Sequence, residues 1–318
     1  MKIACIIPAV NEEATIGEIL IDVMDYVDYV VLVDDGSTDQ TPVIARQMGV
    51  HVVSHQRNMG VGAAFSTGVK EALKMGADVI VTLDADGQFR PEEIQYLVAP
   101  IMNDEMDFVT GSRFSDDATT PKSTWAKRFG NRLFTRLVNR LVKSNFTDTQ
   151  CGFRAYSREA LLRLNTFGRF TYTQEVFLDL ANKNMRMMEV PIHARPRKVG
   201  ESKVVKNPIH YGLRALKIIL QFERDFRPLR FFGVIGLAFI LPGLAMLLIV
   251  FVNWLLTSMS SPYTSFVSIG GILTIVGTIF IILALIADMN GRQRLLQEEM
   301  LYLMRKQYYD NDKEGKDS

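Results

Sequence analysis

Val79-Ile-Val-Thr-Leu-Asp-Ala-Asp-Gly-Gln88 changes character at its midpoint. Its first half, Val79–Leu83, is apolar and rich in β-branched residues, which predicts a short strand buried on both faces. Asp84 and Asp86 follow where this strand ends, and ligands bind at the carboxyl ends of strands in open α/β sheets. Two neighbouring carboxylates repel each other unless a cation lies between them, so the stretch predicts a Mg²⁺ or Mn²⁺ site completed by substrate phosphate oxygens. The structural alternative is an acidic turn before the next helix, because Gly87 fits a strand–turn–helix connection equally well.

Three earlier apolar segments predict further strands, the first two of them buried, and acidic or glycine-rich loops follow three of the four opening strands. Helical periodicity lies between the strands, so an α/β doubly wound sheet is expected, with these loops on one rim. Part of each loop also has a structural explanation, because Asp39 or Ser37 can cap a helix and paired glycines are common in turns. The strands are Lys2–Ile7, Tyr29–Val33 and Val50–Ser54, and the loops contain Pro8-Ala-Val-Asn-Glu12, Asp34-Asp-Gly-Ser-Thr-Asp39 and Asn58-Met-Gly-Val-Gly62.

The overall charge is balanced, with 36 Lys and Arg residues against 35 Asp and Glu residues. This balance gives no reason to expect a nucleic-acid partner. The two cysteines, Cys5 and Cys151, lie far apart in unrelated contexts. They predict no disulfide framework and fit a reducing compartment.

Two uncharged segments, Phe231–Leu256 and Phe266–Ala287, are long enough to cross a bilayer of about 30 Å at about 1.5 Å per residue. The short connection between them predicts an antiparallel hairpin. Arginines flank the outer ends of the two segments, whereas Thr257–Ser265 carries no charge. By the positive-inside rule, both ends and the large preceding domain are expected on the cytoplasmic face of the cell membrane, in a multi-pass protein. The arginines are Arg224, Arg227, Arg230, Arg292 and Arg294.

In chain order, these motifs resemble those of family 2 glycosyltransferases with the GT-A fold. Three later motifs resemble one branch of that family, the dolichyl-phosphate mannose synthases and related polyprenyl-phosphate glycosyltransferases. The resemblance covers roughly the first 210 residues and implies a Rossmann-like GT-A catalytic domain, here followed by a two-helix transmembrane hairpin. The later motifs are Gly111-Ser-Arg113, Asp148-Thr-Gln-Cys-Gly-Phe-Arg154 and Arg197-Lys-Val-Gly-Glu-Ser-Lys203.

The resemblance implies a role for individual residues and a divalent cofactor, Mg²⁺ or Mn²⁺. Val10 stands where mannose synthases often carry an aromatic residue, so the choice between a guanine and a uracil nucleotide stays open. The nucleotide-sugar site would contain Pro8, Val10, Glu12, Val33, Asp35, Asp84, Ala85, Arg197 and Lys203; the metal ligands would be Asp84, Asp86 and Gln88; the acceptor phosphate would be held by Arg113 and Arg128; and the catalytic set would be Asp86, Arg113, Asp148 and Arg154.

An acceptor phosphate of a polyprenyl lipid would need positioning more than activation. Its second pKa lies near ~6, so it is mostly dianionic at neutral pH and already nucleophilic. Forked arginine donors suit that positioning. Asp148 is a candidate general base only for a sugar hydroxyl acceptor, and otherwise a loop cap. Glu175 lies either near the acceptor or on a solvent-facing helix surface.

Two amphipathic segments and a polar tail complete the chain. Trp125–Val142 predicts a helix with Phe129, Leu133, Leu137 and Leu141 on one side and Arg128, Arg132, Arg136 and Arg140 on another. This pattern fits either a core stripe under a solvated basic face or a surface that touches anionic lipid. His210–Phe226 predicts an interfacial helix before the first span, and Asp310–Ser318 predicts a disordered tail. The expected divisions are 1–206 (catalytic domain), 207–230 (juxtamembrane helices), 231–287 (spans 231–256 and 266–287) and 288–318 (cytoplasmic tail).

The leading hypothesis is an inverting, metal-dependent transfer of one sugar from a UDP- or GDP-linked donor to polyprenyl or dolichyl phosphate. A processive polysaccharide synthase with a saccharide acceptor is an alternative, although the Gln-x-x-Arg-Trp motif of those enzymes does not occur in the sequence. A membrane-bound nucleotide-sugar sensor without activity is a third hypothesis. The sequence leaves the sugar, the lipid and the oligomeric state open, including a homo-oligomer.

Overall fold

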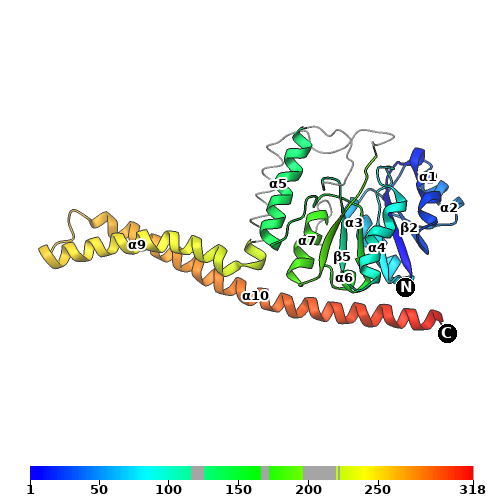
Figure 1. Ribbon diagram of the computed structural model, residues 1–318. Coiled ribbons are helices and arrows are strands. Elements are labelled where there is room, and N and C mark those ends of the chain that lie inside the picture. Colours follow the sequence, from blue (N-terminus) through cyan, green and yellow to red (C-terminus); the bar gives the residue numbers. More distant parts are fainter. Residues whose placement is uncertain (116–124, 166–171, 196–219, 221–222, 318) are drawn as a thin grey trace. The chain divides into compact units, whose positions relative to one another are not determined.

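In the computed structural model, which describes residues 1–115, 125–165, 172–195, 220 and 223–317, seven strands form one mixed sheet (Figure 1). The strand order is β3-β2-β1-β4-β6-β5-β7. Every pairing is parallel except those of β6, which runs antiparallel to both β4 and β5. The predicted α/β sheet is therefore confirmed, and the reversed strand β6 is an addition that the sequence did not predict. The strands are β1 (Ile3–Ala9), β2 (Tyr29–Asp34), β3 (His51–Ser54), β4 (Val79–Thr82), β5 (Phe108–Ser112), β6 (Arg154–Ser157) and β7 (Met187–Pro191).

Helices cover both faces of the sheet, and each face has its own hydrophobic core. One core joins α1, α2 and α4 to the sheet, and the other joins α3, α5, α6 and α7 to it. The predicted apolar side of the first helix is confirmed, since Ile16, Ile19, Leu20 and Val23 are all buried. The helices are α1 (Glu13–Met24), α2 (Thr41–Gln47), α3 (Val61–Lys74), η1 (Pro91–Glu93), α4 (Ile94–Met102), α5 (Trp125–Val142), α6 (Arg158–Arg163) and α7 (Tyr172–Asn182).

Helix α5 occupies the predicted residues, but it is rotated relative to the predicted core stripe. Phe134 and Val138 are buried, whereas Leu133 is 36% exposed. The prediction that Leu133 faces a core is wrong, because Asn131 and Thr135 take inward positions and hydrogen-bond the loop that follows α5. The side chains of Phe129 and Arg128 lie outside the described residues.

Two long helices, α9 (Pro228–Thr257) and α10 (Thr264–Asp317), contain the two predicted spans and are long and apolar enough to cross a membrane. Glycines bring their backbones close together. A Cβ on Gly277 would lie 2.7 Å from the Gly236 carbonyl oxygen, and one on Gly270 would lie 2.8 Å from the Gly243 carbonyl oxygen. This pairing runs in opposite directions along the two helices, as the predicted hairpin requires.

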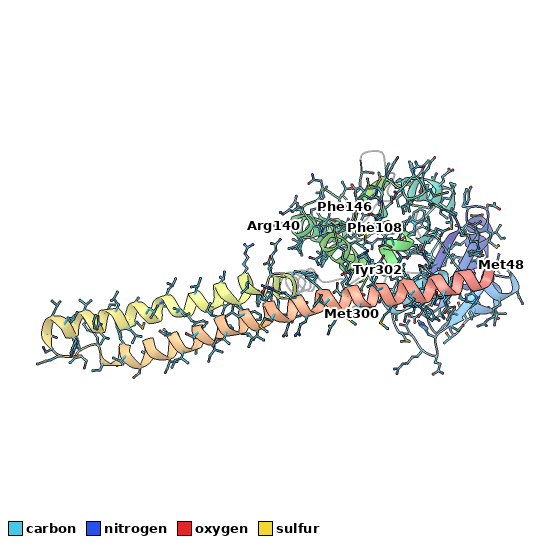
Figure 2. The ribbon with its side chains drawn as sticks, turned by 90° about the horizontal axis from the view of Figure 1, so that it is seen from below. Met48, Phe108, Arg140, Phe146, Met300 and Tyr302 are labelled. Atoms are coloured by element: carbon cyan, nitrogen blue, oxygen red, sulfur yellow. The ribbon has the colours of Figure 1, made fainter. Side chains whose placement is uncertain are left out.

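The chain divides into two compact units, one containing Met1–Tyr211 with Met300–Ser318 and the other containing Gly212–Glu299. The end of α10 is thus part of the catalytic unit. Tyr302 is 6% exposed and packs in its core, whereas Met300 is 63% exposed (Figure 2). Arg305 donates to the carbonyl oxygens of Leu162 and Leu164 at 3.1 and 2.9 Å. The prediction of a disordered tail is therefore wrong as far as Asp317, where the helix ends.

The other predicted divisions stay predictions. Residues 196–219 lie outside the described part of the chain, and so does most of the predicted interfacial helix His210–Phe226.

Candidate active site

The carboxyl ends of β1, β2, β4, β5 and β7 and the amino end of β6 meet at one edge of the sheet. Every motif loop that the structure describes leaves the sheet there. Open α/β sheets bind their ligands at this edge. The site is therefore built from loops that are far apart in the sequence and held by neighbouring strands.

The loop after β4 carries the two carboxylates and is fixed by its backbone. The Thr15 hydroxyl donates to the Ala85 carbonyl oxygen at 2.8 Å, which ties the loop to α1. The Asp86 carboxylate accepts the Gln88 backbone N–H at 3.1 Å, and Gly87 between them has a φ of +71°. These contacts tie the loop at Ala85 and around Asp86.

The residues present fit a divalent cation that shares its ligands with a substrate. Asp84 and Asp86 supply hard oxygen donors, which Mg²⁺ and Mn²⁺ prefer. Over the described part of the chain, three or more His, Cys, Asp or Glu side chains nowhere gather into a metal-binding group. Two carboxylates alone are typical of an ion whose remaining ligands are diphosphate oxygens. Gln88 holds the neighbouring segment through its carbonyl oxygen, which accepts the Arg195 N–H at 2.7 Å.

Gly152 packs directly against the Asp84 carboxylate. A Cβ at position 152 would lie 2.7 Å from Asp84 Oδ2 and 2.9 Å from Oδ1, closer than real Cβ atoms approach. The Gly152 carbonyl oxygen accepts the Thr82 hydroxyl at 2.7 Å, which fixes the distance between the two loops. The loop that begins at Asp148 therefore forms one wall of the carboxylate site.

Arg113 and Asp148 form a two-pronged ion pair beside this wall. Arg113 Nε donates to Asp148 Oδ2 at 2.7 Å and Nη2 donates to Oδ1 at 3.3 Å. Asp148 is fully buried, whereas the Arg113 side chain is 25% exposed. Burial opposes the charge on Arg113, but the Asp148 carboxylate, with a smaller contribution from Asp84, outweighs it and raises the pKa of the guanidinium. Arg113 is thus a permanent cation within electrostatic reach of Asp84.

The Asp148 carboxylate accepts further hydrogen bonds from Asn131 Nδ2 at 3.3 Å and from the Gln150 backbone N–H at 3.1 Å. With both oxygens engaged and no exposed surface, this carboxylate is placed to orient Arg113. That arrangement favours a structural role for Asp148, as a loop cap, over the role of general base.

Asp35 directly follows β2, and its buried carboxylate contacts the residues just before α3. Its carboxylate accepts the backbone N–H groups of Met59 and Gly60 at 2.8 Å each, and His55 Nδ1 lies 2.8 Å from Oδ1. His55 Nε2 in turn contacts the Thr67 hydroxyl at 3.0 Å. The glycine-rich helix start therefore uses its amides to hold Asp35, which supports the turn alternative over direct phosphate binding.

The loops after β1 and β2 are joined by reciprocal hydrogen bonds. The Asn11 N–H donates to Ser37 Oγ at 3.0 Å, and the Thr38 N–H donates to Asn11 Oδ1 at 2.8 Å. Of the predicted nucleotide residues here, Pro8, Val10 and Glu12 are half-buried at this edge, whereas the Val33 side chain is fully buried in the core. Val33 can thus contribute only its backbone to a ligand.

The remaining predicted residues are separated from this group. Arg154 is fully buried, donates from Nη2 to the Thr149 carbonyl oxygen at 3.0 Å and lies 4.9 Å from the Phe177 ring centroid. It therefore supports the Asp148–Arg154 loop and has no exposed surface, and its catalytic role stays a prediction. Glu175 is half-buried on α7, and Arg197 and Lys203 lie outside the described residues.

Sequence reasoning missed the residues that hold these loops in place. The Glu93 carboxylate is 4% exposed and accepts the backbone N–H of His193 at 2.9 Å, with His193 Nδ1 at 2.7 Å. In the sequence, the only available signals for these contacts were Gly152 in the Asp148–Arg154 motif and the acidic residue Glu93 after Pro91. Neither reveals its partner, which lies 68 or 100 residues away.

Comparison with known proteins identifies relatives of this arrangement. The family model described as glycosyl transferase family 2 matches residues 4–164. The chain is 33% identical to the UDP-N-acetylglucosamine–dolichyl-phosphate N-acetylglucosaminyltransferase of Methanococcus voltae, over 59% of this chain and 83% of the relative. It is 34% identical to a dolichyl-phosphate hexose transferase of Haloferax volcanii, over 64% and 86% of the two chains.

A solved structure shares the fold. It is glucosyl-3-phosphoglycerate synthase from Mycobacterium tuberculosis in complex with Mn²⁺, UDP and glucosyl-3-phosphoglycerate, with a TM-score of 0.54 at 20% identity over 70% of this chain and 78% of that one.

Proposed function

Since this chain belongs to glycosyl transferase family 2, we propose that it transfers one sugar from a nucleoside diphosphate sugar to the phosphate of a polyprenyl or dolichyl lipid. The observation that carries the proposal is the Arg113–Asp148 ion pair beside the Asp84 carboxylate, on a chain with two helices able to span a membrane. It combines a site for a metal-bound diphosphate with a fixed cation for a second phosphate. Relatives named for transfer to dolichyl phosphate support the same acceptor class.

The nucleotide-sugar donor is assigned to the loops after β1, β2 and β4. The half-buried Pro8, Val10 and Glu12 would contact the nucleoside, and Asp35 would accept a hydrogen bond from it on the oxygen that carries only the Gly60 amide. Asp84 and Asp86 would hold Mg²⁺ or Mn²⁺ together with the diphosphate. The bound cation would neutralise the leaving diphosphate and fix its orientation.

The acceptor phosphate is assigned to Arg113. Its guanidinium is charged at every physiological pH, as any arginine's is, and Asp148 raises its pKa further. Forked N–H donors match phosphate oxygens. Asp148 accepts hydrogen bonds from Nε and Nη2 and so fixes the plane of the guanidinium that would face the acceptor phosphate. Arg128, Arg197 and Lys203 remain predicted contributors.

The reaction follows from these placements. An acceptor phosphate oxygen attacks the anomeric carbon of the sugar, the bond from that carbon to the diphosphate breaks, and the nucleoside diphosphate leaves with the bonding electrons. A single in-line displacement inverts the anomeric configuration. The acceptor is already deprotonated near neutral pH, so Asp148 needs only to hold Arg113 in position.

We place the catalytic unit on the cytoplasmic face of a membrane that α9 and α10 cross. The balance of flanking arginines supports this orientation. An acceptor whose lipid stays in the bilayer requires an enzyme that is anchored there.

The test uses the full chain in detergent with Mn²⁺ or Mg²⁺, a short polyprenyl phosphate and a panel of radiolabelled UDP- and GDP-sugars. We expect label from one donor to enter the organic phase, and EDTA to abolish it. Asp86→Ala should lose this activity, whereas Asp25→Ala at the exposed end of α1 should keep it. Label recovered in a water-soluble saccharide would favour a saccharide acceptor. Nucleotide binding without transfer from any donor would indicate a non-catalytic protein.

A further inference from the structure

Three arginines form an unpaired ridge along α5. Arg132, Arg136 and Arg140 are spaced four residues apart and therefore share one side of the helix. All three are exposed, and within the described part of the chain none of them forms an ion pair or a hydrogen bond. Elsewhere in the catalytic unit, the exposed Arg186 pairs with Asp107 at 3.0 Å, and the exposed Arg46 donates to the Ser54 hydroxyl at 2.9 Å.

A ridge of leucines runs beside the arginines. Viewed down the helix axis at about 100° per residue, the three arginines span a sector of about 80°. Leu133, Leu137 and Leu141 occupy the adjacent sector, and the buried residues of α5 occupy the sector after that. Leu133 is 36% exposed, and Leu137 and Leu141 are half-buried. The inward sector, which begins at Phe134 and Val138, is already packed in the core. The leucines thus lie between the core and the cations on the surface of α5.

This combination matches the surface of an anionic bilayer. A guanidinium binds phosphate oxygens through several donors and carries less tightly held water than an ammonium group. Leucines adjacent to such cations insert at the boundary of head groups and acyl chains, as in helices that lie in the plane of a membrane. A protein partner would instead need a row of carboxylates that matches the arginine spacing, together with an apolar strip. The candidate membrane spans of the same chain would anchor it to a bilayer, so that α5 would meet the lipid surface at a high effective concentration.

We propose that this face of α5, formed by Arg132, Leu133, Arg136, Leu137, Arg140 and Leu141, lies on the anionic surface of the bilayer. The contact is separate from the active site and does not depend on the sugar or the nucleotide used. It rests on the membrane location proposed above, so the experiment includes a position on the hairpin that reports insertion independently.

The experiment measures the depth of a fluorophore attached to a single introduced cysteine in the full chain, reconstituted into nanodiscs with about 30% anionic lipid. The native cysteines Cys5 and Cys151 are fully buried, so they leave the label to the introduced position. Leu133→Cys is the test position. Tyr96→Cys on α4, 58% exposed in the same unit, is the negative control, and Leu248→Cys on α9, 60% exposed, reports the hairpin. Lipids with a nitroxide on the acyl chain serve as quenchers.

We expect strong quenching at Leu248→Cys, clear quenching at Leu133→Cys and none at Tyr96→Cys. Replacing Arg132, Arg136 and Arg140 by Gln should reduce the quenching at position 133 at least fivefold, because each arginine near an anionic surface contributes about fivefold to binding. Arg46→Gln with Lys70→Gln, on other exposed faces, should leave it unchanged. Nanodiscs with only zwitterionic lipid should reproduce the effect of the triple variant.

The proposal is overturned if position 133 stays unquenched while position 248 is quenched. It is equally overturned if the triple variant is quenched as strongly as the parent. An unquenched position 248 would refute the membrane location itself.

Discussion

Replacing Gly152 by Ala tests whether the Asp148–Arg154 loop positions the metal-binding carboxylate. The added Cβ would lie 2.7 Å from Asp84 Oδ2, and an ordinary contact begins at 3.4 Å, so the carboxylate must move by 0.7 Å (3.4 − 2.7). Gly152 has no positive φ, so the effect is steric and not conformational. A displacement near 1 Å in a catalytic constellation costs up to about 10²-fold in rate. We therefore expect kcat/KM to fall about 10- to 100-fold, with a loss of stability of about 1–3 kcal/mol from overpacking.

The assay combines sugar transfer to polyprenyl phosphate with calorimetric titration of nucleotide in the presence and absence of Mn²⁺. Affinity should fall mainly in the presence of the metal, since Asp84 is the group displaced. Gly17→Ala in α1 is the matched control, because its Cβ would meet only Ile44 at 3.7 Å. Alanine there should raise stability by about 1 kcal/mol and leave activity unchanged. Normal turnover and normal Mn²⁺-dependent binding in Gly152→Ala would refute the placement of Asp84 in the metal site.

Four further predictions address other parts of the catalytic unit. Asp148→Asn should lower turnover at least tenfold while nucleotide affinity changes less than threefold, because the amide cannot hold Arg113 through two charged oxygens. A tenfold loss of nucleotide affinity would instead assign Asp148 to the donor site. His55→Phe should weaken nucleotide binding about three- to tenfold in a titration, with partial recovery in His55→Asn, whose amide is a donor to Asp35. Arg305→Met should destabilise the protein by about 2 kcal/mol, seen as a lower Tm in detergent, and an unchanged Tm would contradict the docking of the end of α10. Burial raises the pKa of Cys151 to about 12, so the thiol stays protonated up to that pH, and alkylation of the native protein should remain negligible between pH 7 and pH 9 and begin only on unfolding.

Much of the fold could be predicted from local patterns. The four predicted apolar runs correspond to β1, β2, β3 and β4. In β1, β2 and β4 a continuous apolar stretch matches burial within the sheet, whereas β3 forms the edge of the sheet and is half-buried or exposed. The reversed strand β6 follows the Asp148–Arg154 motif and carries a buried arginine, so its four residues have no such pattern. The rotation of α5 was also beyond prediction. Its leucines form the more apolar side in sequence, but Asn131 and Thr135 turn inward because the adjacent loop needs their hydrogen bonds.

The sequence by itself determined the family, the alternation of the first four strands with helices, the two apolar helices and the acidic loop at the end of β4. These depend on periodicity and on motifs whose residues are neighbours in the chain. Only the tertiary structure decided that Asp148 holds Arg113, that Gly152 bounds the Asp84 carboxylate, that Arg154 is buried and that the end of α10 belongs to the catalytic unit. The contacts of Asp148, Gly152 and the end of α10 join segments separated by 35 to more than 140 residues. The energy of such contacts, like the burial of Arg154, depends on distances and packing that a linear pattern does not contain.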